Sequence, residues 1–183
     1  MSNQYRYNIF CLVDSSGSIE SSILGSINYA IREIFNQFAN KTHIMVVTYA
    51  NNATFHKQSK DALVDIKQDL SIDATPYRMV NNEKKNISKS NLGKCYQFLK
   101  NHIDANSIPI LSCIFILFSD GDSTDNYKSD LENLLNNQIN IFRLGVALSS
   151  NKSTLNIHST DSSSIFSIHD TPMIINKLNS IIL

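Results

Sequence analysis

The sequence has few cysteines, no excess of charge of either sign and no long apolar run. Its 183 residues include three cysteines, an odd number without C-x-x-C spacing, which argues against a disulfide framework or a cysteine metal cluster. Sixteen basic and sixteen acidic side chains give a formal net charge of zero, so nucleic acid and anionic membranes are not expected as main partners. No stretch approaches the roughly 18 apolar residues of a membrane helix, and the first residues lack a signal-peptide pattern. These absences predict a soluble cytoplasmic protein.

The chain is long enough to form one hydrophobic core. With 42% hydrophobic residues, a chain of this length can bury roughly 70% of the surface that it exposes when unfolded. No internal repeat and no linker divides the sequence. Two of the cysteines, Cys11 and Cys113, lie inside apolar runs and are expected to be buried as small hydrophobic side chains. The sequence therefore predicts a single domain over residues 1–183.

Short apolar runs alternate with segments of helical periodicity along the chain. The apolar runs predict strands at residues 7–13, 43–49, 54–56, 110–118, 141–148 and 165–168. Apolar residues three and four positions apart predict helices over 18–38 with Ser18 as N-cap, weakly over 61–70, and over 92–103, 127–135 and 171–182. Residues 71–90 are polar and are expected to form a long irregular loop, and a serine-rich connector follows residue 148.

This alternation defines the expected fold class. Strands that alternate with helices of ten to twenty residues form a mostly parallel sheet through right-handed crossovers. We therefore predict an α/β, doubly wound, six-stranded sheet with helices on both faces, in which residues 54–56 form one antiparallel edge strand. Ligands of such sheets bind beyond the carboxyl ends of the strands, where the strand order reverses. Candidate functional residues are thus those that follow residue 13, lie near residue 90 or follow residue 118.

Oxygen-bearing side chains stand at all three places. Asp14, Ser16 and Ser18 form a D-x-S-x-S pattern after the first strand, Ser90 opens a helix, and Asp120 follows the central strand. Hydroxyl and carboxylate oxygens suit a small hard dication such as Mg²⁺, which keeps several water ligands. Asp and Ser after a strand also make turns and helix caps, but that explanation does not account for all three places together.

Other polar residues favour structural roles. Asp122 and Asp125 are more typical of a turn and a helix N-cap than of metal ligands. The lysines of the long loop and the following helix could form a basic rim that attracts an acidic ligand, although a solvated loop explains them better; they are Lys84, Lys85, Lys89 and Lys94. The five histidines have no zinc-binding spacing and are expected at the surface or at strand edges.

The chain resembles a von Willebrand factor A domain with a metal-ion-dependent adhesion site. The resemblance rests on Asp14-x-Ser16-x-Ser18, Ser90-Asn91-Leu92-Gly93 and Phe118-Ser119-Asp120-Gly121, and it covers nearly the whole chain. It implies that Ser16, Ser18 and Ser90 bind Mg²⁺ (or Mn²⁺ or Ca²⁺) through their hydroxyls, whereas Asp14 and Asp120 bind mainly through water. The family often has Thr where this chain has Ser90, a change that keeps the hydroxyl.

The resemblance also implies a function. It predicts a non-catalytic module, monomeric alone, whose metal docks an Asp or Glu of a protein partner. Among subfamilies, the chain is most similar to the short cytoplasmic bacterial type of tellurite-resistance and stress operons (TerY-like). A metal-dependent hydrolase or phosphotransferase that uses the same pocket stays open as the alternative. The sequence has no G-x-S-x-G elbow and no glycine-rich phosphate loop to support it.

Overall fold

The computed structural model describes residues 7–19, 21–56, 77–80, 83–86 and 89–183. Its main sheet consists of β1 (Tyr7–Asp14), β2 (Thr42–Tyr49), β3 (Ala53–Phe55), β6 (Cys113–Ser119), β7 (Phe142–Ala147) and β8 (Ile165–Ser167). These six strands lie in the order β3-β2-β1-β6-β7-β8. All neighbours are parallel except β2 and β3, which pair antiparallel at one edge. The predicted α/β fold with one antiparallel edge strand is confirmed.

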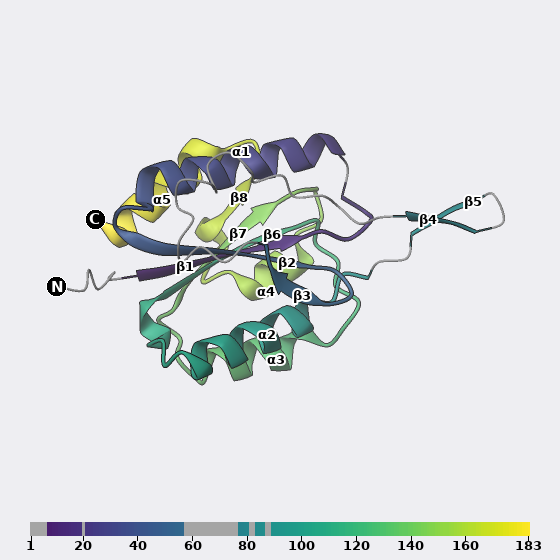
Figure 1. Ribbon diagram of the computed structural model, residues 1–183. Helices are drawn as coiled ribbons and strands as arrows, with labels where there is room; N and C mark the ends of the chain where they lie inside the picture. Colours follow the sequence, from purple (N-terminus) through teal and green to yellow (C-terminus); the bar gives the residue numbers. More distant parts are fainter. Residues whose placement is uncertain (1–6, 20, 57–76, 81–82, 87–88) are drawn as a thin grey trace.

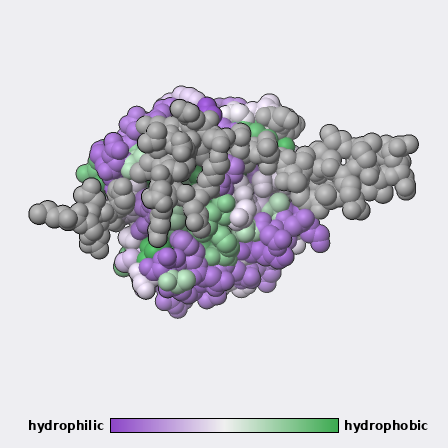
Figure 2. All heavy atoms as spheres, viewed as in Figure 1, coloured by the Kyte–Doolittle hydropathy of each residue, from purple (hydrophilic) through white to green (hydrophobic). Residues whose placement is uncertain are grey.

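Helices cover both faces of the sheet (Figure 1). The helices are α1 (Ser21–Phe38), α2 (Leu92–Ala105), α3 (Tyr127–Leu135), α4 (Ser153–His158) and α5 (Thr171–Ile182). α1 and α5 pack on one face, whereas α2, α3 and α4 contribute to the core on the other. Figure 2 shows that hydrophilic residues dominate the outer surface of the layer that contains α2 and α3. Each of these helices therefore buries one side against the sheet and exposes the other.

The central strand β1 is covered on both faces. Ile9, Cys11 and Val13 belong to the core beneath α1 and α5, and the intervening Phe10 and Leu12 belong to the core beneath α2. All five side chains are fully buried. An almost uninterrupted apolar run is what a strand between two helical layers requires. This packing fixes the carboxyl end of β1, where the candidate site begins.

Two predicted boundaries are wrong. Helix α1 begins at Ser21, so Ser18 is not its N-cap; the Ser18 hydroxyl donates a hydrogen bond to Asp120 instead. The strand predicted over 110–118 begins only at Cys113, because Ile110–Ser112 forms a 3-10 turn. The amide and the hydroxyl of Ser112 both bond the carbonyl of Pro109, at 2.9 and 2.7 Å, and close this turn.

Two segments predicted to be irregular contain regular structure. The serine-rich connector after β7 includes α4, which at six residues is too short to show helical periodicity. Within residues 71–90, β4 (Tyr77–Val80) and β5 (Glu83–Asn86) form an antiparallel hairpin that extends away from the main sheet in Figure 1. β5 is polar and therefore lacks the apolar signal of a strand. The weak helix predicted over 61–70 lies outside the described residues.

The cysteines agree with the sequence analysis. All three cysteines are free and buried, as predicted for Cys11 and Cys113. None of the helices in the described ranges has both the length and the apolar character needed to cross a bilayer.

Candidate metal site

The candidate site lies at the point where the strand order reverses. β1 and β6 are parallel neighbours and are paired up to Val13 and Phe118. From β1 the chain continues to β2 on one side, and from β6 it continues to β7 on the other. The two loops that leave these strands therefore diverge and open a crevice at the carboxyl edge of the sheet. Asp14 ends β1, and Asp120 directly follows β6.

The five side chains predicted as metal ligands lie together in one chain of hydrogen bonds. The Ser90 hydroxyl donates to Oδ2 of Asp14 at 2.7 Å, and the Ser16 amide donates to Oδ1 of Asp14 at 2.8 Å. The hydroxyls of Ser16 and Ser18 lie 3.0 Å apart. The Ser18 hydroxyl donates to Oδ2 of Asp120 at 2.6 Å. Segments that are far apart in sequence thus contribute oxygen atoms to one cluster.

Burial changes across this cluster. Asp14 is completely buried, and Ser16 and Ser90 are nearly so, whereas Asp120 is half-buried and Ser18 is exposed. Burial raises the pKa of Asp14 to about 6, and hydrogen bonds from Ser16 and Ser90 act in the opposite direction. The negative charge of Asp120 raises this pKa a little further. The cluster therefore opens to solvent on the side of Ser18 and Asp120.

Two residues that the sequence analysis missed hold Ser90 in place. The Ser90 carbonyl accepts hydrogen bonds from the Thr124 amide at 2.7 Å, the Ser123 hydroxyl at 3.0 Å and the Thr124 hydroxyl at 3.1 Å. On the other side, the Asn91 amide donates to the carbonyl of Ala50 at 3.0 Å. The backbone at Ser90 is thus fixed between the loops that follow β2 and β6. Only the position of Ser123 and Thr124 just after a predicted strand end could have suggested this role.

Asp125 caps a helix, as its residue type suggested, but the helix is α2 rather than the following α3. Its carboxylate accepts hydrogen bonds from the amides of Gly93 and Lys94, at 3.0 and 3.2 Å, in the first turn of α2. A Cβ atom at Gly93 would collide with the carboxylates of Asp125 and Asp130. Gly93 therefore permits the close approach of α2 and α3 that lets Asp125 bond the helix N-terminus.

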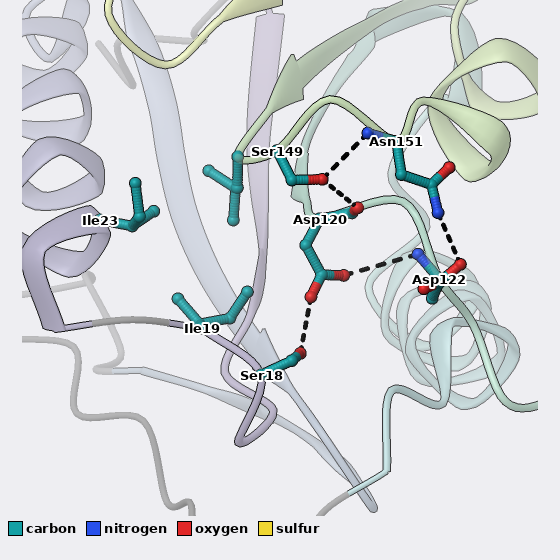
Figure 3. A pocket seen from close by; sticks show the side chains of 8 residues that line it. Ser18, Ile19, Ile23, Asp120, Asp122, Ser149 and Asn151 are labelled. Atoms are coloured by element: carbon teal, nitrogen blue, oxygen red, sulfur yellow. Dashed lines mark hydrogen bonds between the residues drawn. The ribbon is translucent and has the colours of Figure 1, made fainter.

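The loop after β6 is braced by the loop after β7 (Figure 3). The Ser149 hydroxyl donates to the Asp120 carbonyl at 2.6 Å, and the Asn151 side chain donates to Oδ1 of Asp122 at 2.7 Å. Gly121 has a φ of 102°, and a Cβ atom there would collide with the backbone of Asn151. Sequence reasoning missed Ser149 and Asn151, although polar residues that follow a predicted strand were the available signal.

The remaining polar candidates do not join the cluster. The Lys94 ammonium donates to the Asn51 carbonyl at 3.2 Å, which ties it to the turn after β2; the proposed basic rim stays a prediction. His158 is fully buried, so the expectation that every histidine lies at the surface or a strand edge is wrong. Its Nδ1 lies 2.8 Å from the Tyr96 hydroxyl, and its ring stacks on that of Tyr96.

The donor set fits a hard dication. Among the described residues, no group of three or more His, Cys, Asp or Glu side chains could hold a metal. A metal ion at this edge of the sheet would therefore depend on the hydroxyls of Ser16, Ser18 and Ser90 as well as on two carboxylates. Oxygen donors of this kind suit Mg²⁺, Mn²⁺ or Ca²⁺ rather than a thiolate-preferring ion.

The fold and this cluster define a doubly wound α/β domain with oxygen-bearing side chains gathered at its switch point. The chain belongs to the von Willebrand factor type A domain family, whose model matches residues 8–180. Domains of this family typically are metal-dependent adhesion or protein-interaction modules and usually are not catalytic. No curated protein matches the sequence.

Solved structures show the same fold at low sequence identity. Proximal thread matrix protein 1 from the mussel byssus is 16% identical, with a TM-score of 0.71 over 98% of this chain and 47% of that one. The same mussel protein has been solved with zinc in its metal-ion-dependent adhesion site (MIDAS) motif. That structure is 14% identical, with a TM-score of 0.68 over 98% of this chain and 46% of that one. Manganese-loaded TRAP protein from Plasmodium vivax is 14% identical, with a TM-score of 0.63 over 95% and 75%. This chain thus spans about half the length of the mussel protein.

Proposed function

We propose that this protein is a divalent-cation-dependent interaction module that docks an acidic residue of a protein partner. Ser16, Ser18 and Ser90 would bind Mg²⁺ directly, and Asp14 and Asp120 would bind it mainly through water. The single observation that carries the proposal is the hydrogen-bonded cluster that joins these five side chains around a completely buried Asp14. In the described part of the chain, no basic side chain forms an ion pair with either carboxylate.

The charges of the cluster explain why the partner would be acidic. A buried carboxylate without a cation is costly, and a dication would offset the charges of Asp14 and Asp120 together. Carboxylates that bind through water neutralise the ion less completely than direct ligands do. The ion would then keep an affinity for one more carboxylate, which an Asp or Glu of the partner supplies. Mn²⁺ and Ca²⁺ share this preference for oxygen ligands.

The biological setting is a narrower part of the proposal. Of the similar structures, one has zinc in its MIDAS motif and another is manganese-loaded, which supports metal binding by this protein. We propose a single domain over residues 1–183 that is monomeric alone and acts in the cytoplasm, in a bacterial stress or tellurite-resistance system of the TerY-like type. The resemblance of the sequence to those short members supports this setting.

A thermal-unfolding titration with Mg²⁺, Mn²⁺ and EDTA tests the metal site. A bound ion stabilises the native state by about 2.7 kcal/mol at a hundredfold excess over Kd, which shifts Tm by several degrees at this size. We expect this shift in the wild type and in Glu132→Gln, which removes one exposed carboxylate on α3, but not in Asp14→Asn. An equal shift in Asp14→Asn would refute the assigned site.

The same proteins test the hydrolase or phosphotransferase alternative. An interaction module releases no phosphate from p-nitrophenyl phosphate in Mg²⁺ or Mn²⁺. Release above the level of Asp14→Asn would support the enzyme and overturn the proposed function.

A further inference from the structure

A cavity of about 310 Å³ lies beside the candidate metal site, between the segment that leads into α1 and the loops after β6 and β7. Its lining has two kinds of surface (Figure 3). One is apolar and consists of Ile19, Ile23 and Leu148. The other is polar and includes Asp120, Asp122 and Asn151. A volume at the low end of ligand pockets suits one long side chain rather than a larger molecule.

The polar wall carries a carboxylate, Asp122, that has no ion pair with any described residue. Asp122 is exposed, and its Oδ1 accepts a hydrogen bond from the side chain of Asn151 at 2.7 Å, which fixes the carboxylate at the cavity. Within the described ranges, neither a lysine nor an arginine forms an ion pair with Asp122. A dication bound by the neighbouring cluster would offset the charges of Asp14 and Asp120, and it would leave Asp122 without a counterion among the described residues.

The occupant must therefore be apolar along its length and positively charged at its end. We propose that this cavity binds an arginine side chain of the partner, next to the acidic residue that binds the metal. The methylene stem would lie on Ile19, Ile23 and Leu148, because long basic side chains bury their stems on apolar surface while the charged end stays near water. The guanidinium would reach Asp122, since its planar set of donors matches a carboxylate.

The charges of the two sites favour a partner that carries an arginine next to its acidic residue. When the partner's carboxylate binds the metal, it adds a negative charge close to that of Asp122. An arginine on the same partner offsets one of these two charges and can donate to Oδ2 of Asp122, since the Asn151 hydrogen bond uses Oδ1. The inference rests on the proposed function for the acidic residue alone; the arginine preference of the cavity can be measured without it.

The test uses three blocked amino acids that differ only in the side chain. Nα-acetyl N-methylamides of arginine, citrulline and norleucine are titrated into ¹⁵N-labelled protein, with Mg²⁺ and with EDTA. Citrulline keeps the shape of arginine without its charge, and norleucine keeps the apolar stem alone. We expect arginine to shift the amide signals of Ile19, Gly121 and Asn151 with an affinity about two- to fivefold above that of citrulline, as for a solvent-exposed ion pair.

Two variants test whether Asp122 causes the preference for arginine over citrulline. Asp122→Asn should remove the advantage of arginine over citrulline, and Glu132→Gln, which removes the same charge on α3, should retain it. Equal binding of norleucine and arginine would overturn the proposal in favour of an apolar occupant. Retention of the arginine preference in Asp122→Asn, or no shift at the three amides, would also overturn it.

Peptides test whether one partner can use both sites. Glycine-based peptides carry Glu and Arg separated by zero to three residues, and each is matched by a citrulline peptide. We expect at least one spacing to bind more tightly in Mg²⁺ than its citrulline match, with EDTA removing the contribution of Glu but not that of Arg. A peptide series without any arginine preference would refute the inference. Loss of the Mg²⁺ and Glu dependence alone would refute only the proposed function.

Discussion

Ser90 and Asp14 are 76 positions apart in the chain, yet the Ser90 hydroxyl donates a 2.7 Å hydrogen bond to the Asp14 carboxylate beneath the surface of the candidate site. This contact joins the segment just before α2 to the end of β1. The amide of Ser16 donates a second hydrogen bond to the same carboxylate, at 2.8 Å. The side chain that lies deepest in the cluster is thus oriented by a hydroxyl that is itself a proposed metal ligand.

Ser90→Ala should therefore weaken Mg²⁺ binding and destabilise the metal-free protein. The variant removes a proposed ligand and leaves one oxygen of the buried Asp14 without the Ser90 donor, which costs about 1–3 kcal/mol of unfolding free energy. Titration calorimetry with Mg²⁺ and urea unfolding in EDTA measure the two effects. Ser90→Thr keeps the hydroxyl and should retain most of both properties. If Ser90→Ala bound Mg²⁺ as tightly as Ser90→Thr, the hydroxyl would not be a ligand.

Asp14 should make the metal-free protein less stable as the pH rises. Burial raises its pKa to about 6 in the folded state from 3.8, so the carboxyl contributes most to stability when protonated, below about pH 4. That contribution is lost as the pH rises through 6 and amounts to about 3 kcal/mol at most. The difference in unfolding free energy between the wild type and Asp14→Asn, measured by urea in EDTA from pH 4 to 7.5, should follow this course. A pH-independent difference would show that the pKa of Asp14 is not raised in the folded protein.

His158 should have the opposite dependence on pH. Burial lowers its pKa to about 3 from 6.5, and the nearby charge of Arg143 lowers it further. The unfolded chain therefore binds a proton that the folded protein excludes, and stability falls as the pH falls from 6.5 towards 3, by about 1.4 kcal/mol per pH unit at most. His158→Gln should flatten this part of the urea stability profile, with the exposed His169→Gln as the control. An unchanged slope in His158→Gln would assign the acid sensitivity to other groups.

The parts of the fold that the sequence predicts are those that depend on burial. Successive apolar side chains of β1 point alternately into the two cores on either face of the sheet. The apolar residues of α2 and α5, three and four positions apart, are the ones that these helices bury. The D-x-S-x-S pattern at Asp14 could be identified because its residues are close in sequence and follow a strand. These features arise from local patterns that one core imposes.

The parts that the sequence does not predict depend on contacts between distant segments. Nothing around Asp125 reveals that it caps α2, since its partners Gly93 and Lys94 lie 32 and 31 positions away. The contact between Asn151 and Asp122 likewise joins two loops. Helix α4 is too short to show the spacing of apolar residues that identifies a helix, and the hairpin strand β5 has no apolar run. Such features follow from how the sheet brings loops together rather than from local composition.

Gly121→Ala should weaken Mg²⁺ binding by displacing Asp120. Gly121 has a φ of 102°, which strains any residue with a Cβ atom, and the added atom would collide with the carbonyl of Asn151. The loop must shift to relieve the collision, and it carries Asp120 with it. We expect a loss of about 1–3 kcal/mol in unfolding free energy and a several-fold weaker Mg²⁺ affinity by titration calorimetry.

Gly25→Ala is the matched control for this substitution. No atom lies within 4 Å of a Cβ built at Gly25, and the residue lies inside α1, where Ala is favoured over Gly by about 0.8–1.0 kcal/mol. The same chemical change should therefore stabilise the protein at Gly25 and leave Mg²⁺ binding unchanged. If Gly121→Ala lost stability but kept the wild-type Mg²⁺ affinity, the position of Asp120 would not matter for the metal, and its role as a ligand would have to be abandoned.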